Sequence, residues 1–161
     1  MELESAQKIS EAEFGVKGSI TPLAGERNPN FLVTSETEKN VLKIHDFEEE
    51  LQLEVQQVAL AALSELTSFQ TPNTVPSKSG ERLVKIQDGK FARLLTWIDG
   101  ELWSEAKDLG EDHKVQLGKL IASVDSKLAE VDASMHLEIL NRPFGWNVLQ
   151  AEDLLADIKL I

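Results

Sequence analysis

The turns between the strand-like segments of this chain are too short for any connection except a hairpin. Three such segments follow one another early in the sequence, separated by polar stretches at 25–28 and 35–39. Parallel neighbours need crossovers of about a dozen residues or more, so strands joined this closely are antiparallel. Two later segments meet at Asp88-Gly89, a dipeptide typical of hairpin turns. The five predicted strands are residues 18–23, 30–34, 40–45, 82–87 and 91–97.

One long helix is predicted between the third and fourth strands. Across residues 47–66 apolar side chains recur at the i, i+4, i+7 and i+8 positions, which is the stripe of an amphipathic helix. Glutamates occupy residues 48–50, in the first turn, where the helix dipole favours negative charge. A shorter helix is expected over residues 2–14, and Gly15 ends it as a residue that tolerates the left-handed conformation.

The pattern becomes helical after residues 98–101, which read as a linker. An apolar stripe runs from Val115 to Val131, a loop covers 142–146, and a last helix is expected from Asn147 to about residue 159. The order of elements predicts an α+β fold. It comprises a lobe at 1–97, with a five-stranded antiparallel sheet and one long helix, and a helical segment at 98–161.

The bulk composition excludes several classes of function. A formal net charge of −12 argues against a nucleic-acid partner, because nucleic-acid binders usually present a basic face. The absence of cysteine excludes disulfides, thiolate metal sites and a catalytic thiol. No apolar run reaches the roughly 20 residues of a membrane span. We therefore expect a cytoplasmic protein with no membrane partner, and the three histidines lack the spacing of a zinc site.

The ordered set of segments resembles the aminoglycoside phosphotransferase and choline kinase superfamily, which is related to the protein kinases. Within it, the chain looks closest to domains grouped with hydroxylysine kinase, some of which are fused to class III, pyridoxal-phosphate-dependent aminotransferases. The resemblance implies a protein-kinase-like N-terminal lobe followed by the first helices of an incomplete C-terminal lobe. The stretches that carry it are LAGERNPNFLV (23–33), NVLKIHD (40–46), LEVQQVALAAL (53–63), RLLTWIDGELW (93–103) and NRPFGWNVLQAEDLL (141–155).

Lys43 on the third predicted strand is the first candidate for chemistry. Alternation places it on one face with Val41, and the pattern alone also fits a solvated strand lysine. The resemblance implies that Lys43 contacts the phosphates of ATP and is held by a glutamate of the following helix. With Leu51 as the centre of the apolar stripe, Glu54 lies about 60° from that centre and Glu50 about 100°. We predict Glu54 as the partner, and Glu50 is the alternative.

The turn between the first two predicted strands is the second candidate. Gly25 permits close approach of the backbone, and Asn28 and Asn30 follow it, so backbone N–H groups could cover phosphates. A plain hairpin turn also fits these residues. The resemblance implies that this turn covers the nucleotide.

The junction after the fifth predicted strand is the third candidate. The resemblance implies that Leu95 lines the back of the pocket, that the Thr96 carbonyl accepts from the adenine amino group, and that the Ile98 N–H donates to a ring nitrogen. The alternative is an edge strand followed by a turn at Asp99-Gly100.

The catalytic part of the superfamily pattern is not found in these 161 residues. None of His45, His113 and His136 begins an H-x-D-x-x-x-x-N motif, and no metal-binding aspartate is recognised. We therefore expect an inactive N-terminal part of an enzyme that transfers phosphate from ATP to a hydroxyl of an amino-alcohol or amino-acid-like acceptor. The resemblance implies that the Mg²⁺ ligands of this enzyme lie beyond residue 161. The alternative is a non-catalytic binding or regulatory domain fused to an aminotransferase. Apolar surface on the last helices would then favour self-association.

Overall fold

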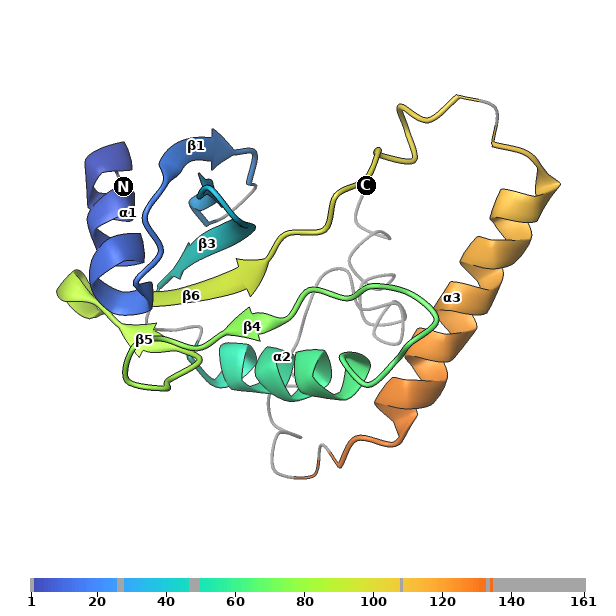
Figure 1. Cartoon of the computed structure of the whole chain (residues 1–161). Helices are drawn as coiled ribbons and strands as arrows, with labels where there is room; N and C mark the ends of the chain where they lie inside the picture. The colour runs from blue at the N-terminus through green and yellow to red at the C-terminus, as the bar shows by residue number, and fades with distance from the viewer. Residues whose placement is uncertain (1, 26–27, 47–49, 108, 133, 135–161) are drawn as a thin grey trace, which may run out of the picture. The chain divides into compact units, whose positions relative to one another are not determined.

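An antiparallel sheet of six strands is built from residues 19–96 (Figure 1). The structure is a computed structural model, and it describes residues 2–25, 28–46, 50–107, 109–132 and 134. The strand order is β1-β2-β3-β6-β4, and β5 also pairs with β6. The strands are β1 (Ser19–Leu23), β2 (Asn30–Thr34), β3 (Lys39–His45), β4 (Thr74–Val75), β5 (Val84–Lys85) and β6 (Phe91–Thr96).

Three helices accompany the sheet in the described residues: α1 (Leu3–Ile9), α2 (Glu50–Leu63) and α3 (Glu111–Ala129). A π-helical turn, η1 (Ser10–Phe14), continues α1 and ends at Gly15, whose φ of 74° is the left-handed value that glycine adopts without strain. A single 3₁₀ turn, η3 (Gln87–Gly89), joins β5 to β6.

The hydrophobic core lies on one face of the sheet, under α1 and η1. Alternate residues of β2 and β3 point to this face, so Val33, Leu42 and Ile44 are almost fully buried while their neighbours are more exposed. Ala6 and Phe14 close the core from the helical side. The remaining buried members of the cluster are Val16, Phe31, Val84, Ala92 and Leu94.

Helix α2 lies on the opposite face of the sheet, as its polar contacts show. Gln56 Oε1 accepts from the Arg93 guanidinium of β6 at 2.6 Å, and Gln57 Oε1 accepts from the Thr74 hydroxyl of β4, also at 2.6 Å. Leu53, about one turn before Gln56 and Gln57 in the helix, is fully buried. The α+β fold class predicted from the sequence is therefore confirmed.

The structure corrects three details of the sequence-based prediction. The sheet has six strands rather than five, because the extended chain at Thr74–Val75 pairs with Leu94 and Leu95 of β6. The hairpin at Asp88-Gly89 forms, with φ of 63° and 69°, but β5 is limited to two residues. The buried face of α2 is centred on Leu53 and not on Leu51, which is 38% exposed.

Several predictions fall outside the described residues. These are the loop at 142–146, the helix from Asn147 and the last stretch of the resemblance at 141–155. In the part of the chain that is described, no helix combines the length and apolar character needed to cross a membrane.

Candidate functional site

The sheet register places Lys43 in the middle of the face that α2 occupies. Lys43 of β3 is directly opposite Asn30 of β2 and Arg93 of β6, and side chains of directly paired residues point to the same face. Because residues two apart share a face, Val41 and its cross-strand partner Leu95 lie beside them. The sequence-predicted residues Asn30, Lys43 and Leu95 therefore come together on one surface.

The charge environment of Lys43 is unusual for a lysine. Partial burial lowers its pKa, and the positive charge of Arg93 lowers it further. Among the described residues, no carboxylate forms an ion pair with the Lys43 ammonium group. A cation held in this way gains from any anion that enters the face beside it.

The structure changes the geometric argument for the carboxylate partner of Lys43. The prediction of Glu54 rested on Leu51 as the buried centre of α2, and the buried residue is Leu53. Measured from Leu53, Glu50 is about 60° away around the helix and Glu54 about 100°. Both glutamates are exposed. The pairing of Lys43 with either glutamate stays a prediction. The angle around the helix from the buried residue now favours Glu50 over Glu54.

Arg93 is a residue that sequence reasoning missed. It is only 3% exposed, and one of its amino groups donates to Gln56 of α2 at 2.6 Å. It therefore joins the sheet to the helix immediately beside Lys43. The signal in the sequence was a charged residue flanked by apolar residues within the strand FARLLT, because an arginine is seldom fully buried without a specific partner.

Gly25, after β1, is closely approached by Asn28 and Asn30. A Cβ at Gly25 would lie 2.5 Å from Asn30 Nδ2 and 2.6 Å from the Asn28 carbonyl oxygen, so only glycine fits without a shift. Asn28 Nδ2 lies 3.2 Å from His45 Nδ1, and the Pro29 carbonyl accepts from the Ile44 N–H at 3.1 Å. The turn is thereby fixed to the end of β3. Residues 26 and 27 lie outside the described residues.

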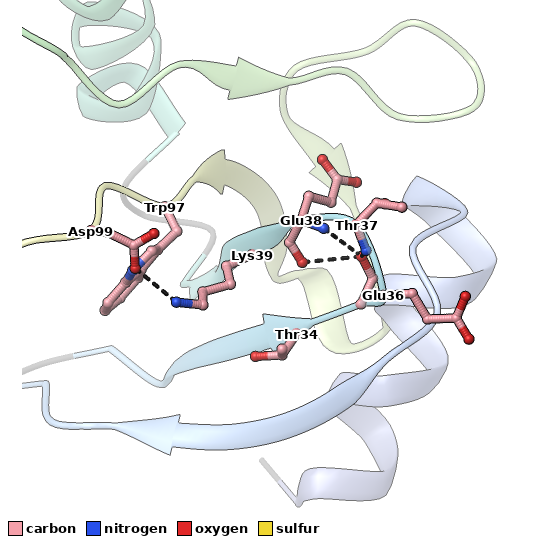
Figure 2. A pocket seen from close by; sticks show the side chains of 8 residues that line it. Thr34, Glu36, Thr37, Glu38, Lys39, Trp97 and Asp99 are labelled. Carbon is pink, nitrogen blue, oxygen red and sulfur yellow. Dashed lines mark hydrogen bonds and ion pairs between the residues drawn. The ribbon is translucent and has the colours of Figure 1, made fainter.

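The chain leaves the sheet at Thr96 through a polar junction, which Figure 2 shows together with the pocket beside it. The Trp97 N–H donates to the Lys39 carbonyl at 3.1 Å, and Asp99 Oδ1 accepts from Lys39 Nζ at 2.7 Å and from Trp97 Nε1 at 2.9 Å. These two hydrogen bonds lower the pKa of Asp99, that from Lys39 most. The contacts hold the junction against the start of β3.

The pocket beside this junction, of about 280 Å³, is lined by the turn between β2 and β3 and by Trp97 and Asp99. It lies at the opposite end of β3 from the Gly25 turn, because β3 begins at Lys39 and ends at His45. None of the sequence-predicted site residues lines it. We therefore place the candidate site on the face of Lys43 rather than in this pocket.

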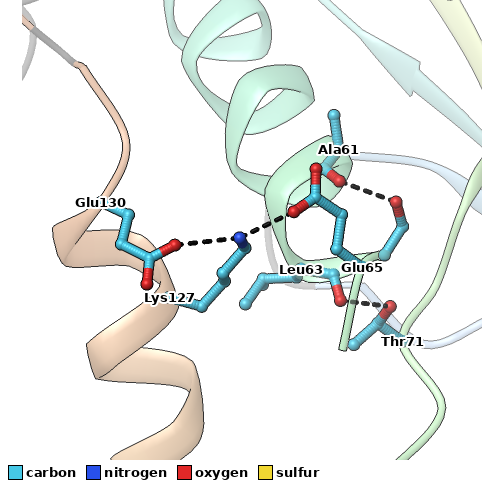
Figure 3. A network of polar contacts seen from close by, with 7 residues as sticks. Ala61, Leu63, Glu65, Thr71, Lys127 and Glu130 are labelled. Atoms are coloured by element: carbon cyan, nitrogen blue, oxygen red, sulfur yellow. Dashed lines mark hydrogen bonds and ion pairs between the residues drawn. The ribbon is translucent and has the colours of Figure 1, made fainter. Parts of the chain in front are cut away.

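Helix α3, after the junction, contacts the end of α2 through Lys127 (Figure 3). Lys127 Nζ lies 2.7 Å from Glu65 Oε2 and 3.0 Å from Glu130 Oε2, and the two carboxylates raise the pKa of Lys127, Glu65 most. At the end of α2, hydroxyl groups donate to two of the last carbonyls, Ser64 to Ala61 and Thr71 to Leu63, and backbone N–H groups donate to those of Leu60 and Ala62. No catalytic or metal-binding role follows from this contact.

Comparison with known proteins shows which fold this arrangement represents. No family model matches the sequence, and no curated protein matches it. The structure of spectinomycin phosphotransferase APH(9)-Ia, in complex with ADP and spectinomycin, matches with a TM-score of 0.64 and 11% identity, over 94% of this chain and 45% of that one. The microcompartment-associated aminopropanol kinase matches with a TM-score of 0.55 and 23% identity, over 78% of this chain and 40% of that one.

The fold predicted from the sequence resemblance is thus confirmed. The chain has the α+β fold of the N-terminal lobe in kinase-like small-molecule phosphotransferases. It spans less than half the length of either matched structure. A fold of this kind does not by itself fix activity or substrate, which depend on the residues of the site.

Proposed function

We propose that this chain forms the nucleotide-binding lobe of an ATP-dependent small-molecule phosphotransferase. The observation that carries the proposal is the shared face of Asn30, Lys43 and Leu95, which the register of three strands brings together. The Gly25 turn lies at one side of this face, and the junction at Thr96 lies at the other. A cation, a close-approach turn and an exit strand are the parts with which kinase-like lobes hold ATP.

In this proposal Lys43 binds the α- and β-phosphates. Its ammonium group is placed on a rigid strand, so little side-chain freedom is lost when phosphate binds. Burial and Arg93 disfavour its charged form, and a phosphate would relieve both effects by supplying negative charge. Glu50 or Glu54 would orient the lysine once ATP is bound, and a structure with bound ATP decides between them by the distances from Lys43 Nζ.

The other predicted residues receive separate roles. The turn at Gly25, Asn28 and Asn30 covers the phosphates with backbone N–H groups. Leu95 lines the back of the adenine pocket, and the backbone at Thr96 and Ile98 recognises the adenine edge. Among the described residues, no group of three or more His, Asp or Glu side chains is placed to hold a metal ion. Mg²⁺ enters the proposal only as the ion that accompanies ATP.

The proposed acceptor is a hydroxyl of an amino-alcohol or amino-acid-like molecule. The matched structures are named for aminopropanol and spectinomycin. The net charge of −12 attracts a cationic amine over long distances and supports an acceptor of this class. A cytoplasmic location belongs to the same proposal.

A non-catalytic nucleotide-binding domain, fused to an aminotransferase, is the second candidate. The two candidates predict the same ATP binding and differ in phosphoryl transfer. If the full-length product of the gene phosphorylates an amino alcohol, the second candidate is excluded.

The test of the nucleotide site is ATP binding by the Lys43→Ala variant. NMR titration suits it, because it measures weak affinities. We expect the variant to lose about tenfold or more in ATP affinity, because a charge-assisted hydrogen bond contributes about 1.5–3 kcal/mol. Lys8→Ala is the matched control, since Lys8 lies on α1 with its side chain 74% exposed, on the opposite side of the sheet. Equal ATP affinity in the Lys43→Ala variant and the wild type would sink the proposal.

A further inference from the structure

Thr96 forms two hydrogen bonds with Asn73 that differ from an ordinary strand pair. The Thr96 N–H donates to the Asn73 carbonyl at 2.8 Å. In return the Asn73 N–H donates to the hydroxyl Oγ1 of Thr96, at 2.9 Å, and not to the Thr96 carbonyl. In a regular antiparallel pair that carbonyl would take the second hydrogen bond. The hydroxyl therefore takes the place of the backbone acceptor.

The direction of the strand shows where the Thr96 carbonyl points. The Trp97 N–H donates to Lys39 of β3, so the backbone groups of Trp97 face β3. Adjacent residues of an extended strand direct their backbone groups to opposite sides, so the Thr96 carbonyl faces away from β3, towards Asn73. Among the described residues, no backbone N–H donates to this carbonyl. It remains available at the edge of the proposed adenine pocket.

We propose that the Thr96 hydroxyl is a positioning group for base recognition, which occupies the Asn73 N–H so that the Thr96 carbonyl stays available for the amino group of adenine. This inference rests on the proposed function. It adds a side-chain role at a junction where recognition otherwise involves only backbone atoms. Without the hydroxyl, the Asn73 N–H would turn to the carbonyl and compete with the base.

The chemistry of the bases makes this inference selective. Adenine presents an amino donor at its sixth position, whereas guanine presents a carbonyl acceptor there. A free backbone carbonyl therefore favours adenine and repels guanine. Competition from the Asn73 N–H weakens the bond to adenine and leaves guanine binding without a comparable loss.

The experiment is an NMR titration of the 161-residue chain and two Thr96 variants with ATP and with GTP. Thr96→Val keeps the branched shape and removes the hydroxyl, and Thr96→Ser keeps the hydroxyl. We expect Thr96→Val to lower the ratio of ATP to GTP affinity by about threefold to tenfold, the value of one net hydrogen bond. Thr96→Ser should keep the wild-type ratio. A general structural defect would lower both affinities together and leave the ratio unchanged.

A second readout needs no nucleotide. A scalar coupling across the hydrogen bond between the Asn73 amide nitrogen and the Thr96 carbonyl carbon should appear in Thr96→Val and be absent from the wild type and Thr96→Ser. The inference is wrong if ATP binds in a Lys43-dependent manner and Thr96→Val keeps the wild-type ratio. It is also wrong if the coupling is already present in the wild type. If Lys43→Ala leaves ATP affinity unchanged, or no ATP binds, the proposed function fails and this inference fails with it.

Discussion

Lys43 is the residue at which sequence and structure agree most closely. The alternation of β3 predicted that Lys43 shares a face with Val41, and the register adds Asn30 and Arg93 as its direct neighbours. What the sequence did not indicate is the effect of Arg93, whose positive charge adds to burial in lowering the pKa of Lys43. Burial and the charge of Arg93 thus both make the charged form of Lys43 unfavourable for stability. A phosphate-binding role would explain why a lysine occupies this position.

The lowered pKa of Lys43 predicts how stability depends on pH. Between the lowered value and the ordinary 10.5, the folded chain binds fewer protons at Lys43 than the unfolded chain, so stability rises with pH across that window. Below the window the cost of the buried charge is fully present. We therefore expect Lys43→Met to melt a few degrees higher than the wild type at pH 7, with a gap that shrinks as pH approaches 10.5. Thermal melts of both proteins over this range measure the gap.

The exposed lysine of α1 supplies the control for that experiment. Lys8→Met removes an equal charge together with a surface ion pair to Glu4, which contributes little to stability. Its melting temperature should stay close to that of the wild type or fall slightly. A melting gap for Lys43→Met that is absent at pH 7, or that grows with pH, would contradict the assignment of a disfavoured charge at Lys43.

At the scale of elements, α2 shows what periodicity can and cannot predict. The apolar spacing identified the helix, because a repeat near 3.6 residues is a local property. It did not identify the buried face, since glutamines take part in the contact with the sheet. Gln56 and Gln57 bond to Arg93 and Thr74 of the sheet, while the apolar Val58 is 38% exposed. Partners for a polar face come from distant strands and leave no local pattern.

The contact between Gln56 and Arg93 yields a prediction at this scale. Gln56→Ala removes the acceptor that lies 2.6 Å from a guanidinium group that is almost fully buried. We expect a loss of about 1–3 kcal/mol in the free energy of unfolding, the usual cost of taking a partner from a buried donor. Urea denaturation measures it. Gln52→Ala, on the same helix, is the matched control, and an equal effect of the two variants would show that the contact contributes nothing specific.

The missed strand β4 has a similar cause. Its sequence, Thr74-Val75 between Pro72 and Pro76, carries too few residues for a strand pattern. Pairing with Leu94 and Leu95 of β6 makes it a strand. The hairpin at Asp88-Gly89 was predicted because its turn chemistry is local.

At the scale of the whole molecule, the main feature is apolar surface after the junction. Val115 and Ile121 of α3 are 53% and 50% exposed, and Leu102 and Trp103 in the preceding segment are exposed as well. The apolar stripe of α3 was predicted from the sequence, and so was its exposure. Surfaces of this kind favour association with another protein surface.

We expect this surface to cause self-association of the 161-residue chain. Ile121→Lys places a charge at the middle of the α3 stripe and should lower the average mass measured by sedimentation equilibrium at high concentration. Gln116→Lys adds the same charge at an exposed polar position of α3 and should leave the mass unchanged. A chain that is monomeric at all concentrations, or equal effects of the two variants, would rule out association through α3.

The sequence by itself determined the antiparallel strands, the long helix, the left-handed turn at Gly15 and the face of Lys43. Each of these depends on short turns, residue spacing or backbone freedom within a few positions of the chain. Tertiary structure alone decided that Arg93 neighbours Lys43, that Leu53 rather than Leu51 is buried, and that the Thr96 hydroxyl takes the Asn73 N–H. These features join residues more than 20 positions apart, or depend on such contacts, and so arise only when the strands pair.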